Sequence, residues 1–89
     1  MRRTPEQIRR VAVAQECEAG NDDACLRHAE MLIRGDGGLA NQPQALTVLE
    51  TSCDRGHEES CALVGIQRRR VEAQRRRRED LARAAGPRS

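Results

Sequence analysis

One pattern of nine residues occurs twice in the chain, and it constrains the possible folds more than any other feature. The first copy runs from Cys17 to Cys25 and the second from Cys53 to Cys61. The two cysteines, the glycine between them and a small residue four positions beyond each copy all recur at a spacing of 36 residues. A fixed period of roughly 20–50 residues is typical of stacked repeats, in which each unit buries its apolar face against its neighbours. The pattern therefore predicts a helical-repeat protein.

The size and composition of the chain predict one small domain with a weak core. The chain has 89 residues and contains no Trp, Tyr or Phe, so aliphatic side chains, alanine and cysteine must form the core. A small chain buries a low fraction of its surface, and a core without aromatic rings gains less from burial. We therefore expect an additional source of stability, for which the four cysteines are the candidates.

Capping residues and glycines predict four helices. Thr4 can cap the first helix, with Pro5 at its first position and Gln7 completing a capping box. Asn21 and Asn41 are suited to cap the second and third helices, and a glycine follows each of the first three. The expected helices run from Thr4 to Gly20, from Asn21 to Gly35, from Asn41 to Gly56, and from near Glu58 to about Ala84, with Gly86-Pro87 as the stop.

Apolar residues at helical spacing predict which side of each helix is buried. Leu39, in the loop after the second helix, is expected to tuck back as an anchor. The apolar residues expected on the four helices are Ile8, Val11, Ala12, Ala14 and Cys17, then Cys25, Leu26, Ala29, Leu32 and Ile33, then Ala45, Leu46, Leu49 and Cys53, and finally Cys61, Ala62, Leu63, Gly65 and Ile66.

The last part of the chain differs in charge from the rest. Residues 1–66 carry seven arginines and eleven acidic side chains, whereas residues 67–89 carry nine arginines and three acidic side chains. We therefore divide the chain into a repeat region, 1–66, and an Arg-rich helical extension, 67–89. Two runs contain seven of the nine arginines of the extension: Arg68, Arg69, Arg70, Arg75, Arg76, Arg77 and Arg78.

The Arg-rich extension allows three interpretations. Its arginines fall all round a helix and alternate with Glu72, Glu79 and Asp80, which favours a solvated helical tail. The second interpretation is docking to an acidic protein or membrane surface. The third is nucleic-acid binding, which would be sequence-blind and salt-dependent and would lack aromatic rings to stack on bases. Nucleic acid is therefore the least favoured partner.

Several of these residues together resemble the Sel-1-like repeat. The resemblance covers about residues 12–66, and the eight-residue cysteine step is similar to that of the cysteine-rich secreted branch of the family. The residues that carry it are Gly35-x-Gly37, the helix start at Asn41, Ala45, Leu49, the Cys53-x-x-Gly56 turn and Ser60-Cys61-x-x-x-Gly65.

The resemblance implies an α/α solenoid, related to tetratricopeptide repeats, that acts as an adaptor or scaffold. It also implies two disulfides within repeats, Cys17 with Cys25 and Cys53 with Cys61. Short glycine turns between antiparallel helices agree with this pairing, because a disulfide needs a Cα separation of roughly 4.4–6.8 Å. The glycines assigned to repeat turns are Gly20, Gly35, Gly37, Gly56 and Gly65.

Two other states of the cysteines remain open. They could be free thiols in a reducing compartment, or they could join His57 or His28 in a metal or haem site. A short Cys-x-x-Cys step, which is typical of structural zinc, does not occur in either copy. The expected protein therefore has no metal and no cofactor.

Enzyme activity is not expected. Some relatives in the cysteine-rich branch are labelled as β-lactamases or penicillin binders, which makes β-lactam binding an alternative function. A Ser-x-x-Lys nucleophile is impossible here because the chain has no lysine. Ser52 and Ser60 have no evident base in the sequence, so we assign them structural or capping roles. The acidic pairs at 22–23 and 58–59 lie at equivalent positions, where they suit helix starts rather than catalysis.

The sequence thus predicts an all-α, short α/α solenoid of about four helices with a long Arg-rich C-terminal helix. Its expected function is non-catalytic binding of a protein partner, as a unit of a longer repeat array or of an oligomer; the alternative is a basic-tail binder of nucleic acid or anionic surfaces. No membrane span is expected. Paired cysteines favour a periplasmic or secreted location, whereas the lack of a signal peptide in the sequence favours the cytoplasm.

Overall fold

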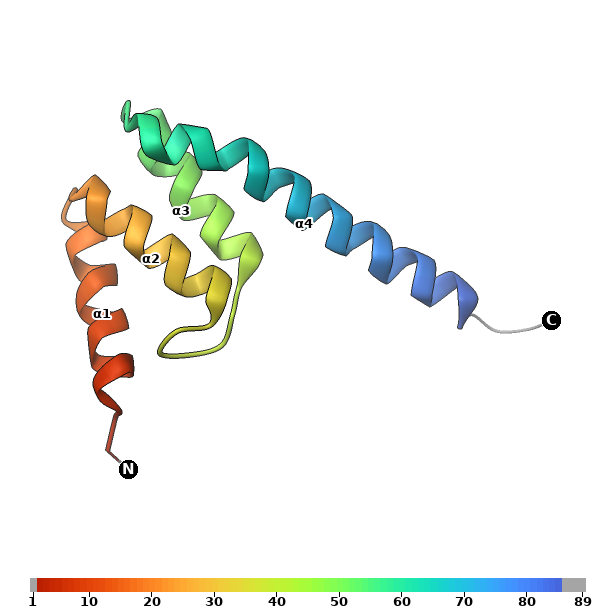
Figure 1. The fold of residues 1–89 in the computed structure, drawn as a ribbon, viewed down its shortest axis with the longest axis horizontal. Helices are drawn as coiled ribbons and strands as arrows, with labels where there is room; N and C mark the ends of the chain where they lie inside the picture. The colour runs from red at the N-terminus through yellow and green to blue at the C-terminus, as the bar shows by residue number, and fades with distance from the viewer. Residues whose placement is uncertain (1, 86–89) are drawn as a thin grey trace.

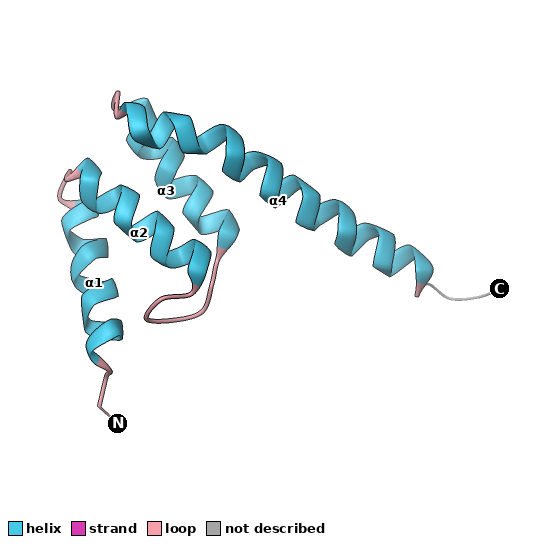
Figure 2. Ribbon diagram, in the orientation of Figure 1, coloured by secondary structure: helices cyan, strands magenta, loops and turns pink. Residues whose placement is uncertain are grey.

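The computed structural model describes residues 2–85, and this part of the chain is all-helical, as predicted (Figures 1 and 2). It contains four helices and no strand in the described range. The predicted stop at Gly86-Pro87 lies outside the described residues. The helices are α1 (Pro5–Glu18), α2 (Asp22–Arg34), α3 (Gln42–Asp54) and α4 (Glu58–Ala84).

The first three helices begin where their capping residues predict. The Gln7 amide donates to Thr4 Oγ1 at 3.2 Å, and the Thr4 amide donates to the Gln7 side chain at 2.8 Å, which completes the capping box. Asn21 and Asn41 each accept a backbone N–H from the first turn of the next helix at 3.1 Å. These bonds satisfy amide groups that would otherwise have no partner within the helix.

The helices form one thin, bent layer. Each helix packs mainly against its neighbours in the sequence: α1 on α2, α2 on α3, and α3 on α4. The last part of α4 extends well beyond α3 (Figure 1). The radius of gyration is 15.8 Å, whereas a globular chain of this length would have about 12 Å. The fold is therefore an open array of helices.

Two small apolar clusters hold the array together. One lies between α2, α3 and α4, and the other joins α1 to α2. The predicted inner faces of α2 and α3 are confirmed, since Leu32 and Leu49 are fully buried. The first cluster consists of Ala29, Leu32, Ala45, Leu49 and Val64, and the second of Val13, Ala24 and Met31 with Cys17 packed beside them.

The predicted inner face of α1 is wrong for Ile8, Val11 and Ala12, whereas Cys17 does pack inward. Val13 is the buried residue of this helix, whereas Ile8 and Val11 are 56% and 41% exposed and Ala12 is also exposed. Among the described helices, α1 packs mainly against α2, so only a narrow stripe of its surface is covered. That stripe contains Val13 and Cys17.

The predicted anchoring role of Leu39 is also wrong, because this side chain is 89% exposed. Arg10 of α1 holds the loop instead. Its guanidinium donates to the Leu39 carbonyl at 2.9 Å and to the Asp36 carbonyl at 3.3 Å. Gly37 permits this close approach, because its φ is +72° and a Cβ there would meet the Glu6 carbonyl oxygen. The loop is therefore attached to α1 by hydrogen bonds from the Arg10 side chain to the backbone carbonyls of the loop.

The first turns of α4 bury a more polar face than the sequence predicts. Ser60, Val64 and Gln67 are buried, and Leu63 is partly buried against the core. Gln67 Nε2 donates to the Gln42 side-chain oxygen at 2.7 Å, so its buried amide has a partner. The predicted apolar residues Cys61, Ala62 and Ile66 are exposed.

Gly65 does not lie in a turn, so its predicted role in a repeat turn is wrong. It lies inside α4, where a Cβ would meet only the Arg69 guanidinium at 3.7 Å. The helix continues through this position because the residues that follow are strong helix formers. The other four glycines assigned to repeat turns all have positive φ, as such turns require: Gly20, Gly35, Gly37 and Gly56.

Candidate functional site

Both repeated corners contain the disulfides that the family resemblance implies. Cys17 is bonded to Cys25 and Cys53 to Cys61, with Cα separations of 4.5 and 4.6 Å. No free cysteine remains among the described residues. The sequence leaves two alternatives open, free thiols and a metal site with cysteine ligands. Neither alternative describes this structure, because all four cysteines are in disulfides.

The backbone of the two corners follows the same path. Gly20 and Gly56 have φ values of +102° and +94°, and neither would be crowded by a Cβ. Their role is therefore conformational, since an L-residue rarely adopts this φ. The corresponding amides also donate to corresponding carbonyls: Gly20 to Cys17 and Gly56 to Cys53, then Asn21 to Glu16 and His57 to Ser52.

The second corner is attached to the start of α2 through Asp22. The Asp22 carboxylate accepts hydrogen bonds from the Arg55 guanidinium (Nε at 2.9 Å, Nη2 at 2.5 Å) and from the Ser52 hydroxyl at 2.9 Å. Arg55 also lies 3.4 Å from the Cys25 sulfur. The Arg55 bonds, and then the Ser52 bond, lower the pKa of Asp22 below its ordinary value of 3.8.

This contact gives the fold a dependence on acid pH. A carboxylate whose pKa is lowered by folding stabilises the fold above its ordinary pKa, and that stability is lost as the pH falls through the lowered value. We expect the Tm to fall below pH 3.8, and the fall to be smaller in Asp22→Asn. Circular-dichroism melts between about pH 6 and pH 2 measure this effect. The control is Asp54→Asn, an exposed aspartate; parallel curves for Asp22→Asn and the native chain would contradict the prediction.

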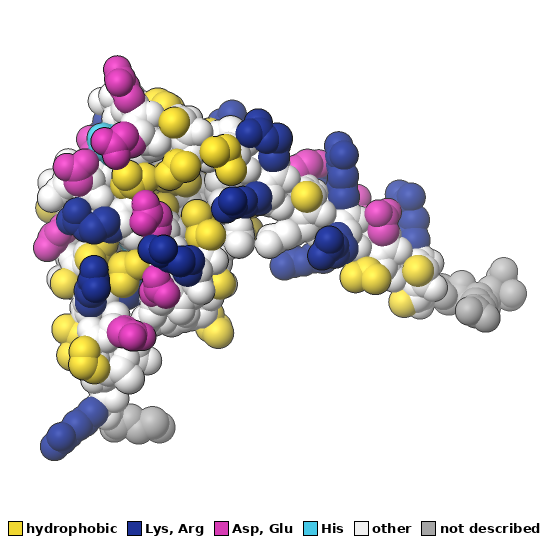
Figure 3. Space-filling model, in the orientation of Figure 1, with side chains coloured by type: hydrophobic (Ala, Val, Ile, Leu, Met, Phe, Trp, Pro, Cys, Tyr) yellow, Lys and Arg dark blue, Asp and Glu magenta, His cyan; other side chains and the backbone are white. Residues whose placement is uncertain are grey.

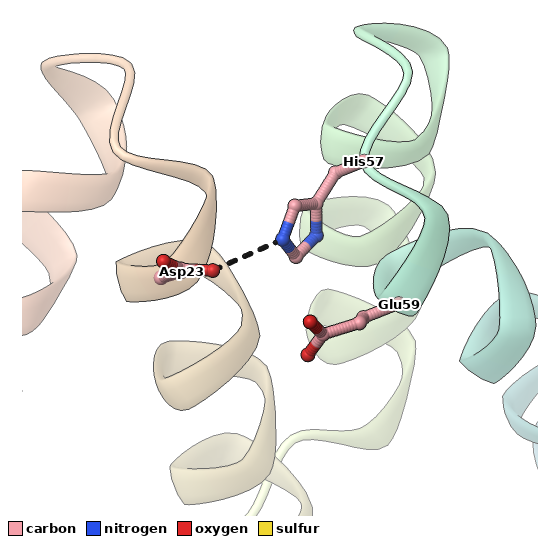
Figure 4. A group of neighbouring side chains, drawn as sticks. All are labelled: Asp23, His57 and Glu59. Carbon is pink, nitrogen blue, oxygen red and sulfur yellow. Dashed lines mark hydrogen bonds and ion pairs between the residues drawn. The ribbon is translucent and has the colours of Figure 1, made fainter.

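His57 makes a second link between the two corners (Figure 4). Its Nδ1 lies 2.7 Å from Ser60 Oγ, and its Nε2 lies 3.1 Å from the Asp23 carboxylate at the start of α2. The side chain of His57 is only 16% exposed, whereas that of Asp23 is 74% exposed. Glu59, in the first turn of α4, brings a second carboxylate close to the same ring.

This arrangement was not predicted, because Ser60 has no evident base in the sequence. The order Asp23–His57–Ser60 resembles a hydrolase triad in its chemistry. Ser60 is fully buried, however, so its hydroxyl faces the protein interior and not a substrate. No local signal in the sequence could have shown this group, since Asp23 and His57 are 34 residues apart.

His28 has a different environment from His57. It is buried on α2, and burial lowers its pKa, with the positive charge of Arg10 acting in the same direction. Its imidazole is therefore held in the neutral form at neutral pH. Among the described residues, His28 is not part of a group of metal-binding side chains.

All seven arginines of the two predicted runs lie on α4 and are exposed. Some of them form ion pairs: Arg68 with Glu50 of α3 at 2.8 Å, and Arg75 with Glu72 at 2.5 Å. Within the described residues, Arg69, Arg70, Arg77 and Arg78 have no such pair. Figure 3 shows the arginines spread along α4, with fewer acidic side chains between them.

A notch separates the projecting part of α4 from the start of α3. On one side it is lined by the 40–43 segment, and on the other by residues of α4 that combine positive charge with an exposed leucine. Leu81 is 62% exposed there. The notch residues are Ala40, Asn41, Gln42, Pro43, Gln74, Arg77, Arg78 and Leu81.

Comparison of the chain with protein-family models, curated proteins and solved structures gives no match. Among residues 2–85, no helix combines the length and the apolar character that crossing a bilayer requires.

Proposed function

We propose that this chain is a non-catalytic protein-binding module of the Sel-1-like repeat type, in which each repeat is closed by a disulfide. The single observation that carries the proposal is the recurrence of one corner: the same glycine conformation, the same backbone hydrogen bonds and the same cysteine pair occur twice, 36 residues apart. Packing of each helix mainly on its sequence neighbours supports a solenoid, since such contacts define repeat arrays.

The notch beside α4 is the surface that best suits a partner. It offers the guanidinium groups of Arg77 and Arg78, which form no ion pair within residues 2–85, next to the exposed Leu81. Apolar contact beside charges of one sign is typical of a groove that takes an amphipathic helix of the opposite charge. We therefore assign the partner as a protein segment that carries acidic residues on one side and apolar residues on the other.

A labelled amphipathic peptide of Glu and Leu tests this proposal by fluorescence anisotropy. The peptide with Lys in place of Glu is the control for charge. We expect Arg77→Glu with Arg78→Glu to weaken binding at least about tenfold, because two attractions become repulsions. The matched variant Arg2→Glu with Arg3→Glu makes the same change of charge on exposed residues before α1 and should bind almost normally. Equal losses in both variants would contradict the proposal.

Binding of nucleic acid or other polyanions is the second candidate, and the exposed arginines along α4 favour it. Its affinity would fall steeply with salt, because each neutralised phosphate releases a counterion. Leu81→Ser separates the two candidates, since this change removes apolar contact and leaves every charge in place. Loss of peptide binding in this variant supports the first candidate. Stronger binding of a single-stranded RNA 20-mer than of the peptide, with a steep salt slope and no effect of Leu81→Ser, supports the second.

A further inference from the structure

Asp23, His57 and Glu59 converge at the junction of the two corners, where Figure 4 shows their side chains facing one another. Asp23 comes from the first turn of α2, whereas His57 and Glu59 come from the start of α4. One ligand atom of each side chain lies within 4.8 Å of the other two. Side chains from two helices thus place one imidazole nitrogen and two carboxylates around a common point.

The imidazole of His57 is fixed in a way that suits metal binding. Its Nδ1 lies 2.7 Å from the hydroxyl of Ser60, which is fully buried, and its Nε2 faces Asp23. Histidines that bind metals usually donate the proton of their other nitrogen to a neighbouring group, which fixes the ring and its tautomer. When Nδ1 holds the proton and donates it to Ser60, the Nε2 lone pair is directed at the carboxylates.

The spacing and the donor atoms both fit a small transition-metal ion. Bonds of about 2.0–2.1 Å in a tetrahedron place neighbouring ligand atoms about 3.3 Å apart. His57 Nε2 and the Asp23 oxygen are 3.1 Å apart, and Glu59 is exposed and can rotate toward them. Imidazole nitrogen favours zinc-like ions, whereas magnesium and calcium favour oxygen ligands alone. The charge also fits, since Asp23 and Glu59 each bring a negative charge to a helix start whose dipole supplies only about half a positive charge.

We propose that Asp23, His57 and Glu59 form a site for one divalent transition-metal ion of the zinc class, with water completing the coordination. The ion would take the place of the proton in the hydrogen bond between His57 Nε2 and Asp23, and that proton would be released to water. Each disulfide closes a corner within one pair of helices, whereas this ion would connect α2 to α4 and so join the two corners.

Titration of the oxidised protein with Zn²⁺ alone tests the site by calorimetry, and Co²⁺ gives a d–d absorption spectrum for the same site. The absence of reductant keeps the cysteines bonded, so thiolates do not compete for the metal. We expect one ion per chain and a rise of Tm with Zn²⁺, because an ion that binds only the folded state stabilises it. Ca²⁺ and Mg²⁺ should produce neither effect.

Substitutions identify the ligands. His57→Gln and Glu59→Gln should each weaken Zn²⁺ binding by more than about tenfold, and Ser60→Ala should weaken it about tenfold through loss of ring orientation. The matched controls are Glu58→Gln, a carboxylate at the same helix start, and His28→Gln, the other histidine; both should bind as the native chain does. Glu59 is exposed, so Glu59→Gln remains decisive if His57→Gln does not fold. Unchanged affinity in Glu59→Gln, or no binding below about millimolar Zn²⁺, would overturn the proposal.

Discussion

Removal of the second disulfide, by Cys53→Ser with Cys61→Ser, is expected to lower the free energy of unfolding by about 2.5 kcal/mol. The bond closes a loop of nine residues, and the chain-entropy relation gives this value for such a loop. Cys61 is exposed and Cys53 is only partly buried, so the serines add little desolvation cost. Reduction of both bonds should remove about 5 kcal/mol, which is comparable with the whole stability of a domain of this size.

Thermal melts followed by circular dichroism measure this effect. For a domain of this length, a loss of about 2.5 kcal/mol corresponds to a fall in Tm of about 10–20 °C. A thiol reductant should lower the Tm of the variant with Cys53→Ser and Cys61→Ser further, because its remaining disulfide, Cys17–Cys25, can still be reduced. If the reductant left the Tm of the native chain unchanged, the bonds would contribute nothing to stability and the prediction would fail.

Leu49→Ala is expected to cost about 3 kcal/mol of unfolding free energy. Leu49 of α3 is fully buried in the cluster that joins α2, α3 and α4, and no aromatic side chain is present to fill the space that its removal would create. The cost combines lost apolar burial with an uncollapsed cavity. Urea unfolding curves, with the slope and the midpoint fitted separately, measure it.

The matched control for this substitution is Leu39→Ala. Leu39 is the same residue type but is 89% exposed, so its removal should change the free energy of unfolding by less than about 0.5 kcal/mol. Similar costs for the two leucines would mean that the cluster between α2, α3 and α4 does not hold the fold together.

The features that the sequence predicts well are those set by nearby residues. The capping box of Thr4 and Gln7 and the turns at Gly20 and Gly56 depend on groups within a few positions of one another. Helix limits could therefore be predicted to within a residue or two. The cysteine pairs belong to the same class, because each bond spans eight positions across one corner.

Features that depend on packing between distant segments could not be predicted. The apolar spacing of α1 allowed more than one inner face, and its contact with α2 selected Val13 over Ile8 and Val11. The link from His57 to Asp23 likewise exists only because the second corner lies against the start of α2. A pattern within one helix contains no information about which neighbour covers it.

The placement of the two sulfur bridges has a mechanical consequence. Cleavage of the loop between Gly35 and Ala40 would leave two fragments, each retaining its own internal bridge and neither covalently tied to the other. Apart from the loop itself and the hydrogen bond from the Asn41 amide to the Leu32 carbonyl, the seam between α2 and α3 is held by side-chain contacts, such as the Asp22–Arg55 pair and the leucines of the first cluster. Under tension the two halves would separate here by the length of the loop, whereas each bridge keeps the two helices of its own half joined at their corner.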